Sequence, residues 1–306
     1  MPGTAALHTS LSRSWSRATI PRHCTAGVRE RQEEPRSMRD HLSSRPQHLF
    51  LSPHLDDAVF SCGGQMVLLR GQGASVHVVT AFTGNAPGPE PPLSDFAVLL
   101  HALWDAGDNP FALRREEDWR ALRLLGASGT HLSHQDAIYR RASVSGAWLY
   151  PDHPAIFGRI APEEAALPRA LAQECAPLCG APGETVVHAP LGAGSHVDHQ
   201  LVRAAALLLG EAGHALRFYE DFPYSEEAGD LEAALADLPP LRPIIIAYDE
   251  EVLRARLAAM ACYGSQLGAV FGGEERMRDL TRAYAARLAQ VSGAALPYAE
   301  REWVLG

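Results

Sequence analysis

Short apolar runs alternate with longer amphipathic segments along most of the chain. Runs of this length that are rich in Val, Ile, Leu and Phe are typical of strands buried in a parallel sheet. We predict such strands at 48–51, 76–82, about 130–132, 184–189, 216–219 and 243–248. The segments between them repeat their apolar positions with a helical period, and we predict helices at 58–69, 113–125, 167–175, 199–209 and about 250–266. This alternation predicts an α/β fold, in which a Rossmann-like, mostly parallel sheet carries helices on both faces.

Two segments depart from this alternation. Residues 1–46 are rich in Arg and Ser and have few periodic apolar positions. We therefore expect a disordered N-terminal extension there and one α/β domain over 47–306. Residues 84–110 are rich in Pro and Gly, which predicts a long loop over the ligand-binding edge of the sheet. This loop has an unusual number of large apolar side chains, namely Phe96, Leu99, Leu100, Leu103 and Trp104. Part of it is expected either to pack on the domain as a small helix or to form a wall of the ligand site.

Two polar motifs follow predicted strands. The sequence His-Leu-Asp-Asp at 54–57 comes just after the strand at 48–51, and His-Val-Asp-His at 196–199 comes shortly after the strand at 184–189. The carboxyl ends of parallel strands lie on one edge of a sheet, and open α/β sheets bind their ligands there. Imidazole and carboxylate groups suit zinc, and a catalytic zinc site uses three of them and leaves one position open. The two motifs therefore predict a hydrolytic metal site at the carboxyl edge of the sheet.

Within each motif the residue types leave a choice of roles. One of the adjacent carboxylates, Asp56 or Asp57, can bind the metal while the other acts as a base, since neighbouring side chains on a turn point in different directions. One of His196 and His199 can bind the metal while the other faces the substrate, and Asp198 can hold a ring N–H from behind. Either motif alone could instead be a set of polar helix caps. Two such motifs at one edge of the sheet favour the metal site.

Composition narrows the function classes. The chain has 306 residues and a net charge of −9, and residues 1–37 hold six Arg and three Glu, so the remainder carries −12. This acidic body argues against a nucleic-acid partner, and no apolar stretch reaches the roughly 20 residues of a membrane span. There is no lysine, which excludes a P-loop lysine and a Schiff-base lysine. The five cysteines are sparse and odd in number, so we expect no disulfide framework and a cytoplasmic location.

The two motifs resemble those of the GlcNAc-phosphatidylinositol de-N-acetylase superfamily (PIG-L or LmbE-like), which includes deacetylases of the mycothiol and bacillithiol pathways. The first family motif reads His-Pro-Asp-Asp-Glu before a glycine-rich helix start. Here Leu55 and Ala58 stand at its Pro and Glu positions, and Gly63 and Gly64 follow. The second family motif, His-x-Asp-His, matches 196–199. Weaker similarities lie at 114–117, 125–126, 136–140, 219–224 and 263–266.

The resemblance implies a role for each residue of the two motifs. It implies three metal ligands, which are His54, Asp57 and His199. It implies three residues that act on the reacting groups or on a ligand: Asp56 as general base, protonated His196 as stabiliser of the oxyanion, and Asp198 as the partner that orients an imidazole. It implies two substrate-binding residues, Arg114 and Asp136. Zinc is the implied metal, and ferrous iron also suits two imidazoles and one carboxylate.

The activity implied by the resemblance is removal of an N-acetyl group from an N-acetylglucosamine-type conjugate. The expected partner is a small amino-sugar substrate, and a homo-oligomer is possible. One alternative is a zinc amidase that acts on another N-acyl amino sugar or secondary metabolite. Another is a carbohydrate-binding module without turnover, but the presence of both Asp56 and His196 argues against it, because a module that only binds needs no base.

Overall fold

The computed structural model describes residues 47–88, 92–104, 107 and 109–306 of the chain. The disorder expected for 1–46 concerns residues outside these ranges. The described strands form a sheet in the order β3-β2-β1-β4-β5-β7-β6. Their bounds are β1 Gln47–Ser52, β2 Val76–Thr80, β3 Ser128–His131, β4 Thr185–Pro190, β5 Ala215–Tyr219, β6 Leu241–Tyr248 and β7 Tyr298–Leu305.

Strands β1 to β5 pair in parallel, and β7 is antiparallel to both β5 and β6. The Rossmann-like, mostly parallel sheet expected from the apolar runs is confirmed. The chain passes from β1 outward to β2 and β3, returns to β4 beside β1, and continues to β5. The connections on the two sides of the β1–β4 pair therefore run in opposite directions. Such a topological switch point is where doubly wound sheets bind their ligands.

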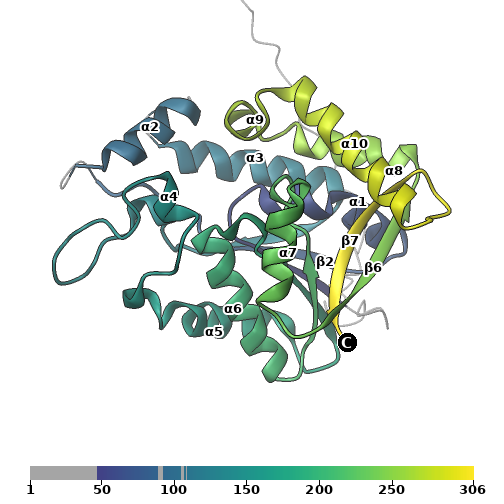
Figure 1. Cartoon of the computed structure of the whole chain (residues 1–306), viewed down its shortest axis with the longest axis horizontal. Helices are drawn as coiled ribbons and strands as arrows, with labels where there is room; N and C mark the ends of the chain where they lie inside the picture. Colours follow the sequence, from purple (N-terminus) through teal and green to yellow (C-terminus); the bar gives the residue numbers. More distant parts are fainter. Residues whose placement is uncertain (1–46, 89–91, 105–106, 108) are drawn as a thin grey trace, which may run out of the picture. The chain divides into compact units, whose positions relative to one another are not determined.

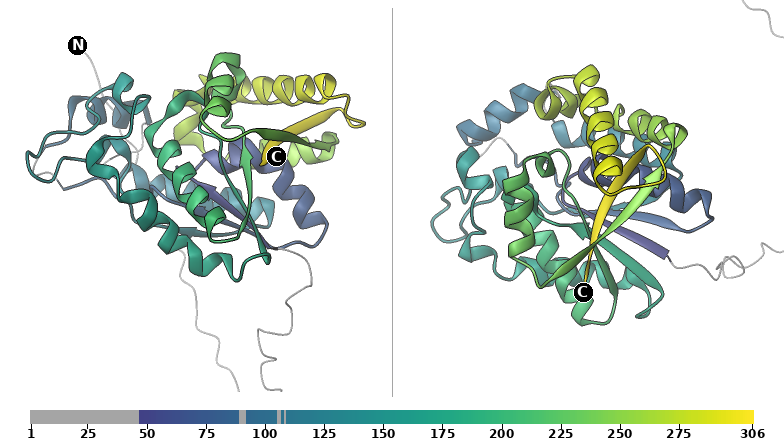
Figure 2. Two further views of the ribbon diagram at one scale, coloured as in Figure 1. Left: turned by 60° about the horizontal axis from the view of Figure 1, so that its bottom comes forward. Right: turned by 45° about the vertical axis from the view of Figure 1, so that its right-hand side comes forward.

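Helices cover both faces of the sheet (Figure 1; Figure 2). One face carries α1 Asp57–Gly71, α3 Pro110–Leu125, α8 Glu250–Met260, α9 Gly264–Phe271 and α10 Glu274–Val291. The other carries α5 Leu167–Cys179, α6 Val197–Glu211 and α7 Ala228–Ala236. Two more helices, α2 Asp95–Trp104 and α4 His153–Ile156, belong to the connections. Because side chains alternate along a strand, β1 sends Phe50 into the first layer and Leu49 and Leu51 into the second. Among the helices of the described residues, we find none with both the length and the apolar character needed to cross a bilayer.

The prediction of a single helix at 250–266 is wrong. The chain forms two helices there, α8 and α9, with a break at 261–263. Glu117 of α3 accepts hydrogen bonds from the backbone N–H of Ser265 (2.9 Å) and from its hydroxyl (2.6 Å). These bonds satisfy donors in the first turn of α9, which would otherwise lack partners. A cap supplied by a distant helix leaves no trace in the local pattern, and this explains the error.

The long loop predicted at 84–110 is partly helical, because it contains α2. Ser94 accepts a hydrogen bond from the backbone N–H of Ala97 (3.0 Å) and so caps the start of this helix. Ala97 and Trp104 are buried, whereas Leu99 and Leu103 are exposed. The segment therefore packs on the domain through one side of a small helix and keeps apolar side chains on the surface as well.

Strand β7 and helix α10 were not predicted from the sequence. The β7 segment contains two glutamates and an arginine in a row, a composition that indicates an exposed segment. In the fold Glu300 and Glu302 are buried. Glu300 accepts hydrogen bonds from the backbone N–H groups of Gly64 (2.8 Å) and Gln65 (2.7 Å) of α1. These two partners of Glu300 lie more than 200 residues away in the sequence, so no local pattern could show them.

Glu302 is also the last member of a chain of buried polar side chains that includes His48 of β1 and His188 of β4. Nδ1 of His48 lies 2.9 Å from Nε2 of His188, and Nδ1 of His188 lies 2.5 Å from Oε1 of Glu302. Arg217 approaches the second oxygen of the same carboxylate at 3.5 Å. Burial, reinforced by the neighbouring His188, lowers the pKa of His48 to about 4. The folded protein therefore holds the His48 ring in its neutral form.

We expect His48 to make the stability of the protein depend on pH. Because the pKa of His48 falls from 6.5 to about 4 on folding, the unfolded chain takes up a proton between these values that the folded chain does not. The contribution of neutral His48 to the free energy of unfolding is complete above pH 6.5. About 2 kcal/mol of this free energy is lost between pH 7 and pH 5. His48→Leu should flatten this part of the profile, although it also lowers stability at pH 7 by leaving Nε2 of His188 without its partner. Urea unfolding at pH 5, 6 and 7 measures the free energy of unfolding of the wild type and the variant. An equal change of this free energy with pH in the two proteins would contradict the prediction.

Candidate active site

The two polar motifs meet at the switch point between β1 and β4. The first motif forms the turn from β1 into α1, and the second lies at the start of α6, after β4. Because β1 and β4 are adjacent and parallel, their carboxyl ends bring both motifs to one edge of the sheet. The placement predicted from the sequence is therefore what the fold produces.

The turn after β1 separates its two adjacent carboxylates. The backbone N–H of His54 donates a hydrogen bond to Oδ2 of Asp57 (2.7 Å). Nδ1 of the His54 ring lies 3.1 Å from the same oxygen. Asp56 takes a different direction, and its Oδ1 lies 3.5 Å from Nη2 of Arg114 on α3. The side chain of Asp57 thus contacts His54, whereas the side chain of Asp56 contacts the guanidinium of Arg114.

His54, Asp57 and His199 form a group that fits a metal ion. One ligand atom from each lies within 4.8 Å of the others. Nε2 of His199 is buried and has no hydrogen-bond partner among the described residues, although Oδ2 of Asp57 lies 3.3 Å away. A buried nitrogen without a donor or acceptor is costly, and a metal ion would remove that cost. Two imidazoles and one carboxylate are also a donor set of catalytic zinc sites.

A second group, composed of His54, His196 and Asp198, satisfies the same distance criterion. In this group both carboxylate oxygens of Asp198 are already engaged, one with Arg140 (2.6 Å) and the other with the backbone N–H of Ala137 (3.1 Å). Nδ1 of His196 accepts a hydrogen bond from the backbone N–H of Asp198 (3.1 Å). The first group is therefore better able to offer free ligand atoms.

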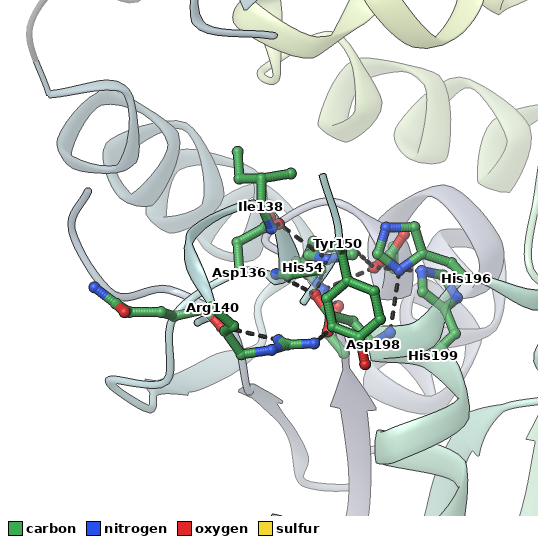
Figure 3. A network of polar contacts seen from close by, with 12 residues as sticks. His54, Asp136, Ile138, Arg140, Tyr150, His196, Asp198 and His199 are labelled. Atoms are coloured by element: carbon green, nitrogen blue, oxygen red, sulfur yellow. Dashed lines mark hydrogen bonds and ion pairs between the residues drawn. The ribbon is translucent and has the colours of Figure 1, made fainter. Parts of the chain in front are cut away.

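Carboxylates hold both imidazoles of the first group from behind. Nε2 of His54 lies 3.0 Å from Oδ2 of Asp198 (Figure 3), and Nδ1 of His199 lies 2.6 Å from Oδ1 of Asp221. These contacts direct Nδ1 of His54 and Nε2 of His199 towards the metal position, as carboxylate partners do in many metal sites. The expected contact of Asp198 with an imidazole is thus present.

Asp221 was given no role from the sequence. It follows β5 on the same edge of the sheet, and its Oδ2 accepts hydrogen bonds from the backbone N–H groups of Gly192 (2.7 Å) and Ala193 (3.0 Å) after β4. The rule that acidic residues just after parallel strands gather at one edge could have found it.

The charges of the site interact strongly. Burial alone would lower the pKa of His199, but Asp57 and Asp221 raise it to about 10. Burial would raise the pKa of Asp57, but His199 and His54 hold it well below its ordinary value. Asp57 is therefore an anion, as a ligand must be, and a metal ion competes with protons for the two imidazoles.

Asp56 has the properties of a base. Burial raises the pKa of this carboxyl to about 6, against the opposing effect of Arg114. A carboxylate with such a pKa is a stronger proton acceptor than an exposed one and is still ionised at neutral pH.

The protonated state expected for His196 is corrected by the structure. Its Nδ1 accepts the backbone N–H of Asp198, so this nitrogen carries no proton. Burial, together with the neighbouring His54, holds the pKa of His196 well below its ordinary value. The ring is therefore neutral with its proton on Nε2, and it can act as an uncharged hydrogen-bond donor.

Both residues expected to bind substrate lie at the site. Oδ2 of Asp136 is 3.6 Å from Nε2 of His54, and Oδ1 accepts the backbone N–H of Ile138 (3.2 Å). Arg114 is buried, and its guanidinium packs over the rings of Trp104 (4.9 Å) and Phe111 (5.1 Å). Arg114 therefore borders the site through Asp56 and also anchors α2.

A cavity of about 360 Å³ opens above these groups. Its polar lining residues include His54, Asp56, Asp57, Arg114, Asp136 and His196. Its apolar lining residues come from α2, α4, α9 and neighbouring loops, among them Phe96, Leu103, Ile156, Phe157 and Val270. The cavity can hold a molecule with a polar head and an apolar remainder.

Comparison with known proteins identifies deacetylases as relatives of this chain. The family model described as GlcNAc-PI de-N-acetylase (PIG-L) matches residues 49–209. The 2'-N-acetylparomamine deacetylase of Streptomyces fradiae is 33% identical over 245 residues, which cover 78% of this chain and 79% of that protein. The enzyme of the same name from Niallia circulans is 32% identical over 194 residues, 58% of this chain and 68% of that protein.

Solved structures of deacetylases have the same fold. The zinc-inhibited form of teicoplanin deacetylase Orf2 superposes with a TM-score of 0.71 at 28% identity, covering 84% of this chain and 97% of that one. The A40926 pseudoaglycone deacetylase Dbv21 superposes with a TM-score of 0.66 at 31% identity, covering 85% and 97%. The similarity therefore extends over nearly the whole length of these structural relatives.

Proposed function

Because this chain belongs to the GlcNAc-PI de-N-acetylase (PIG-L) family and is a de-N-acetylase, we propose that it removes the acetyl group from an N-acetylglucosamine-type unit of a larger conjugate. The observation that carries the proposal is the group of His54, Asp57 and His199, beside the separate carboxylate of Asp56. His54, Asp57 and Asp56 line one cavity. The curated relatives are deacetylases of an amino-sugar compound, which supports a substrate of that class.

His54, Asp57 and His199 are proposed to hold zinc. A bound zinc ion supplies Lewis-acid activation of a water molecule and of the acetamide carbonyl. Zinc is favoured by the donor set. A structural relative is described in a zinc-inhibited form, so zinc binding and turnover with zinc have to be measured separately. Ferrous iron remains the alternative ion, and elemental analysis of the purified protein decides between them.

The side chains around this position divide the remaining work. Asp56 is proposed to accept the proton of the attacking water and later to deliver it to the departing amine. Nε2–H of His196 is proposed to donate a hydrogen bond to the oxygen of the carbonyl as negative charge develops on it. Arg114 favours the ionised form of Asp56 through their contact at 3.5 Å. Arg114 and Asp136 are both proposed to contact the substrate, Asp136 by accepting hydrogen bonds from sugar hydroxyls.

Acyl release from a panel of N-acylated compounds tests the proposal. The panel contains free N-acetylglucosamine, its methyl and aryl glycosides, 2'-N-acetylparomamine, and amino sugars with acyl groups other than acetyl. Release from the glycosides or from 2'-N-acetylparomamine supports an N-acetylglucosamine-type conjugate, whereas release from the other N-acyl amino sugars alone supports the alternative substrate class. Binding of the sugars without any acetate release would contradict the proposal. The homo-oligomeric state and the cytoplasmic location expected from the sequence remain predictions.

The apolar lining of the cavity is proposed to contact the group attached to the sugar. Leu103 and Leu99 lie on α2 and are each 55% exposed, but Leu103 lines the cavity and Leu99 is not among its lining residues. Leu103→Ser should raise KM for an aryl glycoside about fivefold and leave kcat unchanged, because about 1 kcal/mol of apolar burial is lost. Leu99→Ser is the matched control and should change neither constant. Equal effects of the two substitutions would show that α2 does not contact the substrate.

A further inference from the structure

Asp198 uses its two carboxylate oxygens for different partners (Figure 3). The side chain is fully buried. Oδ2 lies 3.0 Å from Nε2 of His54 and accepts the backbone N–H of Ala137 at 3.1 Å. Oδ1 lies 2.6 Å from Nη2 of Arg140. One oxygen therefore serves the imidazole of a proposed metal ligand, and the other serves a guanidinium that comes from the loop after β3.

Arg140 is itself held by a second buried carboxylate. Its Nε forms an ion pair with Glu164, and its Nη2 donates to Oε2 of the same group at 3.3 Å. The hydroxyl of Tyr150 donates to that oxygen (2.5 Å) and accepts the backbone N–H of Ala161 (2.9 Å). The guanidinium also packs over the rings of Phe82 (4.9 Å) and Tyr150 (5.3 Å). These contacts fix the plane of the guanidinium.

We propose that Arg140 is a positioning residue of the metal centre, which acts through Asp198 on the ring of His54. By binding Oδ1, the guanidinium keeps Oδ2 of Asp198 directed at Nε2 of His54, and Nδ1 of that ring then stays turned towards the metal position. Glu164 and Tyr150 hold the guanidinium in the orientation that this requires. The inference rests on the proposed metal site, and it adds to that site a residue whose described contacts include none of the three ligands.

The geometry requires an arginine in particular. A guanidinium is a planar fork that can bind two carboxylates at once, whereas the ammonium of a lysine is a point charge without a fixed plane. Arg140 and Glu164 also line a surface cavity of about 470 Å³. Loss of the guanidinium should therefore admit water to Asp198, so that its charge is not left buried without a partner. We expect a protein without this side chain to fold, with an Asp198 carboxylate that is free to rotate.

The test is the affinity of the full-length protein for zinc, measured by competition with a chromophoric chelator. Arg140→Met should raise the zinc dissociation constant about tenfold, the size of effect typical of partners behind a metal ligand. Arg140→Lys should recover part of this loss, because the charge returns without the fork. Replacement of zinc by cobalt(II) gives a second readout, since the absorption bands of cobalt report the arrangement of its ligands and should shift in Arg140→Met.

Arg141→Met is the matched control. This neighbouring arginine donates to the backbone oxygen of Pro92 and packs on Trp148, and it should bind zinc as the wild type does. Wild-type affinity and an unchanged cobalt spectrum in folded Arg140→Met would overturn the inference alone. If that variant does not fold, Glu164→Gln decides, because a weaker zinc affinity in the folded protein supports the inference and an unchanged one rejects it. A wild-type protein that binds no divalent metal would reject both the inference and the proposed function.

Discussion

Asp56→Asn is expected to lower kcat for acetate release about 100- to 10,000-fold while the protein keeps its metal. The amide has almost the shape of the carboxylate, so the buried position next to Arg114 stays filled. It cannot accept the proton of the attacking water, however, and Asp56 is the carboxylate that the turn after β1 directs away from the group of His54 and Asp57. The measurements are steady-state kinetics of acetate release and the metal content of the same preparation.

Asp57→Asn is the matched comparison, because it makes the same chemical change at the next position. It should weaken metal binding, since Asp57 supplies the carboxylate oxygen shared with His54 and His199. Loss of metal from both variants would mean that the two carboxylates do not have separate roles. Near-normal turnover of Asp56→Asn would mean that another group accepts the proton, and His196 would then be the first to test.

The second large effect is expected at the metal position itself. His199→Ala should weaken zinc binding by more than about 100-fold, because loss of a partner behind a ligand already costs 10- to 100-fold and here the ligand itself is lost. Nε2 of His199 is a buried nitrogen without a hydrogen-bond partner among the described residues, so the substitution removes a group that is free to bind a metal. Elemental analysis after dialysis, together with chelator competition, measures the change.

His134→Ala is the control for this experiment. His134 pairs with Glu174 near the surface (2.8 Å), away from the two motifs, and its loss should leave the metal content unchanged. Full metal occupancy in His199→Ala would remove this residue from the site. The group of His54, His196 and Asp198 would then be the alternative position.

Local patterns in the sequence were enough to predict much of the sheet. Strands β1, β2 and β4 are apolar runs between helical segments, and burial on both faces leaves little choice of residue type in such strands. Strand β7 escaped prediction because its glutamates are buried against partners on α1 and β4. The break between α8 and α9 escaped for a similar reason, since its cap comes from Glu117 on α3.

The sequence alone determined which residues gather at the site, because His54, Asp56, Asp57 and His199 occur in two short motifs, one directly after β1 and one a few residues after β4. The order of the strands then decides that both motifs share one edge. What only the tertiary structure decided is how each group is oriented and charged. The carboxylate behind His199 comes from the loop after β5, and the guanidinium behind Asp198 comes from the loop after β3. The neutral state of His196 follows from one backbone N–H and from burial. These orientations and charges depend on distances of about 3 Å between segments far apart in the chain, because hydrogen bonds and charge interactions in a buried site act over such distances. No local pattern in the sequence encodes these distances.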